Sequence, residues 1–180
     1  VDLSANYTFL EATFRNNDLL NGEANSSADD DGNIVVRAGD RIPLMPRHVF
    51  KARLDWRITP AWSVEAGMLA VSSANARGNE NGLHQPDGTY FLGSGRSNGY
   101  AVFDLGTSWE ATRRLRFFAQ VDRHYATASQ LNATGLTAEG NFIARPFSAS
   151  GDNASVVNST FYAPGAPRTL WAGVRYAFGN

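Results

Sequence analysis

The sequence predicts an all-β fold, namely a segment of an antiparallel transmembrane β-barrel with about six up-and-down strands. Three observations predict it. Apolar and polar residues alternate along six runs of the chain, short and long connections alternate between these runs, and tryptophans stand beside the short connections. We expect each strand to pair with its neighbour in sequence, and the runs occupy residues 2–15, 47–58, 62–73, 99–110, 114–126 and 169–178.

The alternation gives each strand two different faces, because successive side chains point to opposite sides of a sheet. In the second run the apolar side chains share one face and the charged ones share the other: Phe50, Ala52, Leu54 and Trp56 against Lys51, Arg53, Asp55 and Arg57. The apolar face of such a sheet covers a soluble core, or it meets lipid around a wet lumen. Alternation alone leaves both solutions open.

The connections favour the membrane. Two of them, at 59–60 and 111–114, are short turns, whereas those at 17–45, 73–98 and 127–167 are long and polar. Structureless loops beyond about 12–15 residues are uncommon in soluble domains. Outer-membrane barrels combine short periplasmic turns with long extracellular loops. A weaker alternating stretch at 33–37 is expected to belong to the first long loop.

Aromatic side chains mark one end of the predicted strands. Trp56, Trp62 and Trp109 lie within a few residues of the short turns and on the apolar face, and the last strand brings Tyr176 to the same level. Amphipathic aromatic residues form girdles where a barrel meets lipid headgroups. We therefore expect these four residues to form a lipid-facing girdle.

Composition excludes several classes. The 180 residues carry a net charge of −1 and are 43% hydrophobic, which suits one folded domain. No basic excess suggests nucleic acid, and no apolar run reaches the roughly 18 residues of a transmembrane helix. Cysteine is absent, so disulfides and thiolate metal sites are excluded.

No catalytic, cofactor or metal site is predicted, so we do not expect an enzyme. His48, His84 and His124 lack metal-ligand spacing and are interpreted as ordinary surface or lumen side chains. The acidic stretch at 29–32 lacks the spacing and closing Glu of a calcium loop and is interpreted as solvated.

The second predicted strand carries four basic residues that suggest two roles. They could guide an anionic chelate, or they could pair with lumen carboxylates such as Asp55, Glu65 and Asp104, which is the interpretation we favour. The basic residues are Arg47, Lys51, Arg53 and Arg57.

Four segments together resemble, in order, the final barrel strands of TonB-dependent outer-membrane receptors: GDRIPLMPRH (39–48), GYAVFDLGTSW (99–109), DRHYAT (122–127) and APGAPRTLWAGVRYAF (163–178). The resemblance implies that residues 1–180 are the C-terminal part of such a barrel, with the plug domain and earlier strands outside this chain. One departure is an apparent loss of four residues after Asp122. An even deletion preserves the face of each side chain, but it bears on the length of the strand.

By this resemblance the function is uptake of a scarce nutrient, most often a ferric siderophore, at the outer membrane of a Gram-negative bacterium. Haem, cobalamin and carbohydrate remain open as substrates. The implied partners are outer-membrane lipid, the small-molecule chelate, the TonB complex acting through the absent plug, and the barrel assembly machinery. Tyr176 and Phe178 resemble the terminal aromatic assembly signal. Ligand contacts are expected in the three long loops, with no individual residue assigned.

Two other classes stay open. A small structural or adhesive outer-membrane barrel would need a closed sheet. A soluble ligand-binding β-barrel would bury the face of Trp56 and Trp109 as its core. Because open sheet edges are not tolerated in hydrocarbon, six strands in a membrane require pairing partners outside these residues.

Overall fold

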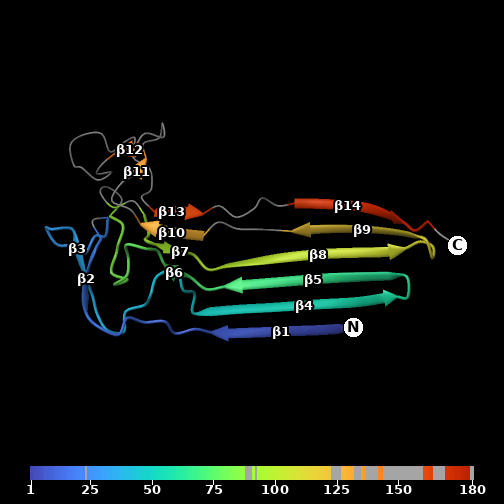
Figure 1. The fold of residues 1–180 in the computed structure, drawn as a ribbon, viewed down its shortest axis with the longest axis horizontal. Helices are drawn as coiled ribbons and strands as arrows, with labels where there is room; N and C mark the ends of the chain where they lie inside the picture. Colours follow the sequence, from blue (N-terminus) through green and yellow to red (C-terminus); the bar gives the residue numbers. More distant parts are fainter. Residues whose placement is uncertain are drawn as a thin grey trace.

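An open antiparallel sheet of six strands dominates the computed structural model (Figure 1). The structure describes residues 1–22, 24–87, 91, 93–122 and 169–178, together with the backbone of four short strands between 127 and 163. The sheet follows chain order and comprises β1 (Asp2–Phe9), β4 (His48–Thr59), β5 (Trp62–Val71), β8 (Tyr100–Glu110), β9 (Leu115–Asp122) and β14 (Thr169–Tyr176). The predicted strand set and the pairing of sequence neighbours are confirmed. No helix long and apolar enough to span a membrane occurs among these residues.

Turns and loops lie at opposite ends of the sheet (Figure 1). The β4–β5 and β8–β9 turns and both termini lie at one end, which we call the turn end. The described parts of the long connections lie at the other end and contain four short two-stranded antiparallel sheets: β2–β3 (Asp18–Asn21, Asn33–Val36), β6–β7 (Ala74–Asn75, Arg96–Ser97), β10–β13 (Thr127–Leu131, Thr160–Ala163) and β11–β12 (Gly135–Leu136, Phe142–Ile143). The stretch at 33–37 belongs to the first loop, as predicted.

The register brings the alternation of all six strands into phase. One row of directly opposed residues crosses the whole sheet and is entirely apolar: Leu3, Leu54, Ala66, Leu105, Val121 and Leu170. The neighbouring row lies on the other face and is mostly polar: Asp2, Asp55, Glu65, Gly106, Gln120 and Trp171. The sheet therefore has one continuous apolar face and one continuous polar face.

The apolar face is not covered by other described residues. Trp56 is 45% exposed, Leu105 is 55% exposed and Trp109 is 52% exposed. The buried apolar side chains of the described residues lie mainly in the loops, where Ile34 and Val36 are fully buried. A soluble barrel would bury the Trp56 and Trp109 face, and this sheet leaves it open, as a lipid-facing wall would.

The first strand ends earlier than predicted, at Phe9 rather than at residue 15. Beyond Phe9 the chain still runs beside residues 39–47, and the Leu10 N–H donates to the Arg47 carbonyl at 2.9 Å. The opposing segment contains Pro43 and Pro46, which have no N–H to donate. The ladder therefore becomes irregular, and the prediction of a strand to residue 15 is wrong.

The last strand is also shorter than predicted. β14 ends at Tyr176, against a predicted end at residue 178, and β9 is described as far as Asp122. Residues 123–126, including the apparent four-residue loss and His124, lie outside the described residues.

Phe118 of β9 and Trp171 of β14 form an aromatic pair on the polar face of the sheet. A Cβ added at Gly173 would lie 2.5 Å from Phe118 Cζ, so the ring occupies the space above the glycine. The ring of Phe118 meets Trp171 edge-on, with centroids 5.5 Å apart. Because Gly173 has no side chain, the Phe118 ring can lie over it and contact Trp171.

Replacing Gly173 with alanine should destabilise the β9–β14 pair by about 1–2 kcal/mol, because the Phe118 ring must move away from Trp171. Gly106→Ala is the matched control, since its added Cβ would meet nothing closer than 3.8 Å. Denaturation midpoints of the full-length protein in detergent would measure both. Equal midpoints for the two variants would contradict this account of Gly173.

Candidate functional site

The first and second long loops are joined by hydrogen bonds through Asn25. This side chain is 1% exposed. Its amide nitrogen lies 3.0 Å from the Gly78 carbonyl oxygen, 3.3 Å from Asn79 Oδ1 and 3.2 Å from Asn81 Oδ1. Asn25 Oδ1 accepts from the N–H and the hydroxyl of Ser27, which in turn accepts from Asn81 Nδ2 at 2.8 Å. The buried side-chain amide of Asn25 therefore has hydrogen-bond partners in both loops, as buried polar groups require.

His84 fixes a second contact between the same loops. The Ser26 N–H donates to His84 Nδ1 at 3.0 Å. Nδ1 therefore carries no proton, and Nε2 donates to the Gly93 carbonyl at 2.7 Å. Phe91 meets the imidazole edge-on at 5.6 Å. His84 is only 6% exposed, so its interpretation as a surface or lumen histidine is wrong.

Burial lowers the pKa of the His84 imidazole, while its hydrogen bond to Gly93 and the nearby carboxylate of Asp87 act in the opposite direction. The packed loops therefore favour the neutral ring. Protonation would place a hydrogen on Nδ1, where it faces the Ser26 N–H.

Three arginines gather at the loop end of the sheet. Burial lowers the pKa of Arg41, and the positive charges of Arg47 and Arg96 lower it further, while Glu11 opposes the change. Arg47 forms an ion pair with Glu11 at 3.0 Å, and its guanidinium lies 5.8 Å from the centre of the Phe9 ring. Three cations with one close carboxylate make this position suitable for an anion.

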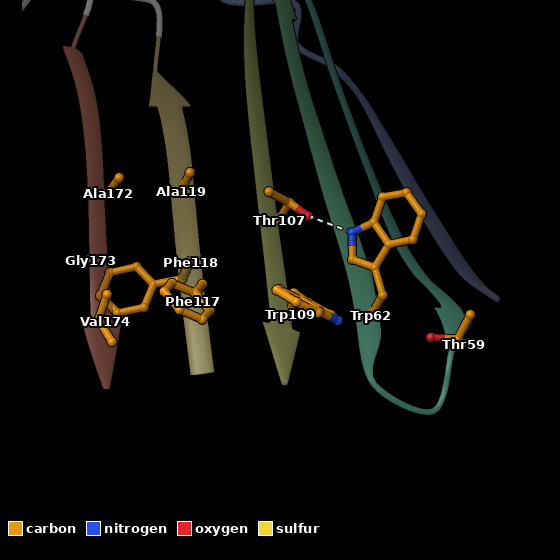
Figure 2. Close-up of a pocket in the computed structure, with 10 residues that line it drawn as sticks. All are labelled: Thr59, Trp62, Thr107, Trp109, Phe117, Phe118, Ala119, Ala172, Gly173 and Val174. Carbon is orange, nitrogen blue, oxygen red and sulfur yellow. Dashed lines mark hydrogen bonds between the residues drawn. The ribbon is translucent and has the colours of Figure 1, made fainter. Parts of the chain in front are cut away.

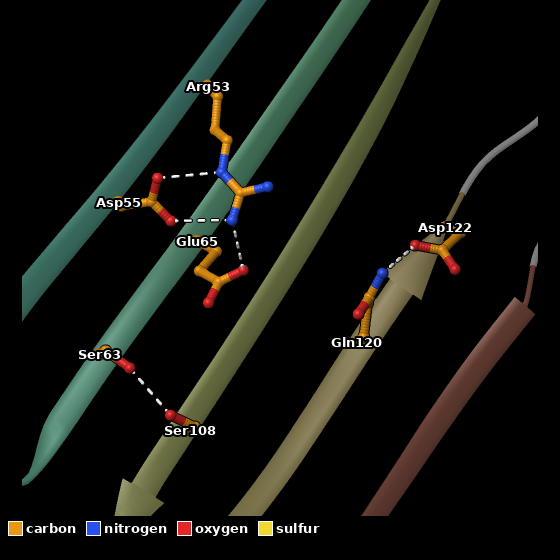
Figure 3. Close-up of polar contacts among 7 residues, drawn as sticks. All are labelled: Arg53, Asp55, Ser63, Glu65, Ser108, Gln120 and Asp122. Atoms are coloured by element: carbon orange, nitrogen blue, oxygen red, sulfur yellow. Dashed lines mark hydrogen bonds and ion pairs between the residues drawn. The ribbon is translucent and has the colours of Figure 1, made fainter. Parts of the chain in front are cut away.

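The polar face carries a compact ion cluster in its middle (Figure 3). Arg53 binds both carboxylate oxygens of Asp55, at 2.9 and 3.1 Å, and reaches Glu65 at 3.2 Å. The predicted pairing with lumen carboxylates is therefore confirmed for Arg53. Lys51 and Arg57 make no ion pair with any described residue, and the partner of Arg47 is the loop residue Glu11.

The predicted girdle residues lie on the apolar face near the turn end. Trp62 and Trp109 are directly opposed, and Trp56 and Tyr176 lie in the adjacent rows. Trp62 Nε1 donates to Thr107 Oγ1 at 2.9 Å, and Trp109 stacks on Phe117 at 5.8 Å (Figure 2). Beside them is an apolar groove of about 970 Å³ that is also lined by Ala119, Ala172 and Val174. The indoles therefore project from the apolar face near one end of the strands.

The terminal aromatics form a pair of their own. Tyr176 meets Phe178 edge-on at 4.8 Å, and Phe178 is largely exposed. Tyr176 is the last residue of the β9–β14 ladder and Phe178 lies two residues beyond it, and both side chains are exposed. Their role in assembly stays a prediction.

No three His, Cys, Asp or Glu side chains lie close enough to bind a metal within the described part of the chain. In the acidic stretch, Asp29 Oδ1 accepts from the N–H groups of Asp31 and Asn33 at 3.1 and 2.8 Å. This carboxylate therefore caps its own turn.

Comparison with known proteins identifies the family to which this chain belongs. A family described as TonB dependent receptor-like, beta-barrel, matches residues 1–122, more than half of the chain. The chain belongs to this family. It is a family of receptors, not of enzymes, and the resemblance found in the sequence is confirmed. No curated protein matches the chain.

Two solved structures show the same fold. The ferric-catecholate import receptor Fiu from E. coli K12, in its closed form, is 21% identical with a TM-score of 0.53, and the match covers 98% of this chain and 18% of that one. The siderophore receptor PiuA from Acinetobacter baumannii is 10% identical with a TM-score of 0.55, and the match covers 97% and 19%. The chain therefore spans about a fifth of the length of these receptors.

Lowering the pH should weaken the contact between the first two loops at the Ser26–His84 hydrogen bond. The usual pKa of histidine is about 6.5, and that of His84 is lowered in the packed loops. The stability that depends on the neutral ring is complete above the usual value and is lost as the pH falls through the lowered pKa.

Hydrogen exchange measures this at the Ser26 amide. After correction for intrinsic rates, we expect its protection to fall as the pH drops below about 6.5, the usual pKa of histidine. The Phe14 amide, which donates to the Asp40 carbonyl, is the internal control. His84→Gln should abolish the pH dependence at Ser26; unchanged dependence in that variant would exclude His84 as its source.

Proposed function

We propose that residues 1–180 are the C-terminal part of the barrel of an outer-membrane TonB-dependent receptor that imports an anionic ferric chelate of the siderophore type. The observation that carries the proposal is the uncovered apolar face, which runs in register through six strands of a chain belonging to this receptor family. A transmembrane strand needs about 9–11 residues when tilted. The six strands have 8–12 residues, which suits this thickness.

In this arrangement the turn end faces the periplasm of a Gram-negative cell and the loops face outward. Trp56, Trp62, Trp109 and Tyr176 form the girdle at the inner interface, where amphipathic rings are favourable. Tyr176 and Phe178 are presented to the barrel assembly machinery. The TonB complex acts through a plug outside this chain.

The two sheet edges require partners in the same receptor. β1 and β14 lie at the edges of the described sheet, and each unpaired backbone group in hydrocarbon costs several kcal/mol. We propose that other strands of the receptor barrel pair with both edges. The length of the solved receptors, about five times that of this chain, supports such a continuation.

The ligand is proposed to bind at the loop end, where charge and pre-formed structure coincide. Arg41 lies in the first loop and Arg96 in the second, and the positive charge of Arg96 contributes to the lowered pKa of Arg41. The contacts of Asn25 and His84 hold these two loops together. An anionic chelate suits Arg41, Arg47 and Arg96 better than neutral cobalamin or a neutral carbohydrate does, because Glu11 is the single carboxylate that offsets their effect on Arg41.

In the full-length receptor, the double variant Arg41→Gln, Arg96→Gln should weaken binding of an anionic ferric chelate about tenfold, the scale expected for charge-assisted hydrogen bonds. Quenching of intrinsic tryptophan fluorescence measures binding, and growth in iron-limited medium measures uptake. Arg113→Gln with Arg114→Gln, at the opposite end of the sheet, is the matched control. Equal binding by the two double variants would refute the arginine site, and failure of the unaltered receptor to bind any ferric chelate would refute the function.

A further inference from the structure

The apolar face of the sheet is hollowed near the turn end, in the groove of about 970 Å³ beside the girdle tryptophans (Figure 2). Three small side chains cross the groove in directly opposed positions: Thr107, Ala119 and Ala172. The adjacent row toward the loops is Leu105, Val121 and Leu170, and the adjacent row toward the turns is Trp109, Phe117 and Val174. Because both flanking rows carry larger side chains, the middle row forms a depression between them.

The middle of this groove is apolar in its available chemistry. The hydroxyl of Thr107 accepts from Trp62 Nε1 at 2.9 Å and donates to the Ser63 carbonyl at 3.1 Å. The alanines on either side of the β9–β14 pair present methyl groups alone. The polar side-chain atoms in the middle of the groove are therefore already paired, which suits a hydrocarbon chain.

The turn-side edge of the groove carries a hydrogen-bond donor without an acceptor. The indole nitrogen of Trp109 makes no hydrogen bond with any described residue, whereas that of Trp62 is bonded to Thr107 (Figure 2). The Trp109 ring is 52% exposed and stacks on Phe117. Indole N–H groups at a membrane interface usually bond to a polar group of the surroundings. Trp109 is therefore placed to bond to an acceptor that enters from the turn end.

Two arginines lie in the turn that joins the strands of Trp109 and Phe117. Arg113 and Arg114 are exposed, and neither makes an ion pair with any residue that the structure describes. The turn itself is held by other atoms, because the Arg114 N–H donates to Thr112 Oγ1 at 3.2 Å and the Arg114 carbonyl accepts from the Ala177 N–H at 2.9 Å. Two positive charges therefore lie uncompensated at the turn end of the three strands that carry the groove.

We propose that this groove binds one anionic phospholipid of the periplasmic leaflet of the outer membrane. An acyl chain lies over the stacked rings of Trp109 and Phe117 and fills the depression at Ala172. The phosphate accepts from the Trp109 N–H and binds Arg113 or Arg114, whose long side chains can reach the interface and whose guanidinium groups match phosphate oxygens. The proposal rests on the proposed function, because the apolar face must meet lipid with its turn end toward the periplasm.

Native mass spectrometry of the full-length receptor in detergent tests the proposal, with dioleoyl phosphatidylglycerol as the anionic probe and dioleoyl phosphatidylcholine as the zwitterionic comparison. We expect one phosphatidylglycerol molecule to bind in preference to phosphatidylcholine. Arg113→Gln with Arg114→Gln should lower its affinity about ten- to thirtyfold, the scale of two basic side chains at an anionic membrane surface. Arg113→Lys with Arg114→Lys should retain most of the affinity, because the charges remain.

A second pair of variants tests the groove itself. Ala172→Leu keeps the face apolar and fills the depression, so it should lower the phosphatidylglycerol affinity about fourfold, the scale of one buried methylene group. Ala101→Leu is the matched control, since it lies on the same face of β8 but near the loop end, outside the groove. It should leave the affinity unchanged.

The failing outcomes separate this proposal from the proposed function. Equal affinity for the two lipids, or phosphatidylglycerol binding that either the arginine-to-glutamine pair or Ala172→Leu leaves unchanged, would refute the lipid site and leave the receptor function standing. A receptor dimer that Ala172→Leu disrupts would assign the groove to a second copy of the receptor and would also refute the lipid site. A receptor that stays monodisperse in water without detergent would refute the lipid-facing sheet and with it the proposed function.

Discussion

A polypeptide in hydrocarbon must satisfy its backbone polar groups with its own hydrogen bonds, and the rest of this structure depends on that constraint. A β-sheet satisfies these backbone groups by hydrogen-bonding each strand to its neighbours. Once the strands are paired, the two-residue repeat assigns each side chain to lipid or to the interior. The unbroken row from Leu3 to Leu170 is the direct result, because a slip of one residue in any pair would move charged groups such as Arg53 to the apolar face.

The same geometry leaves the polar face with an electrostatic problem. Charged residues cannot leave that face, so they must be compensated within it or by whatever fills the interior. Arg53 is compensated by Asp55 and Glu65, and Arg116 is compensated by Glu110. Lys51 and Arg57, on the same face, make no ion pair with any described residue.

The two-residue alternation of apolar and polar side chains made the sheet predictable from the sequence. The features that were not predicted lie where this alternation is absent. The faces of Leu54 and Leu105 follow from alternation alone. The end of β1 at Phe9 required weighing Pro43 and Pro46 on the opposing segment, because prolines disrupt the partner strand as well as their own. The contacts of Asn25 and His84 could not be predicted. They join loop residues more than 50 positions apart, and loops carry no repeat from which such contacts could be inferred. Gly173 likewise showed its role only when the register placed it beneath Phe118.

The central claim is that the odd-numbered residues of β8 meet lipid while the even-numbered ones face a wet interior. Single-cysteine scanning of residues 101–109 tests it most directly, because these 180 residues contain no cysteine of their own. Spin labels attached at each position of the full-length receptor in lipid vesicles would report collisions with dissolved oxygen and with a water-soluble nickel complex. The account predicts that oxygen collisions dominate at Phe103, Leu105 and Thr107, and that nickel collisions dominate at Asp104, Gly106 and Ser108. Uniform accessibility along β8, or alternation in the opposite phase, would contradict it.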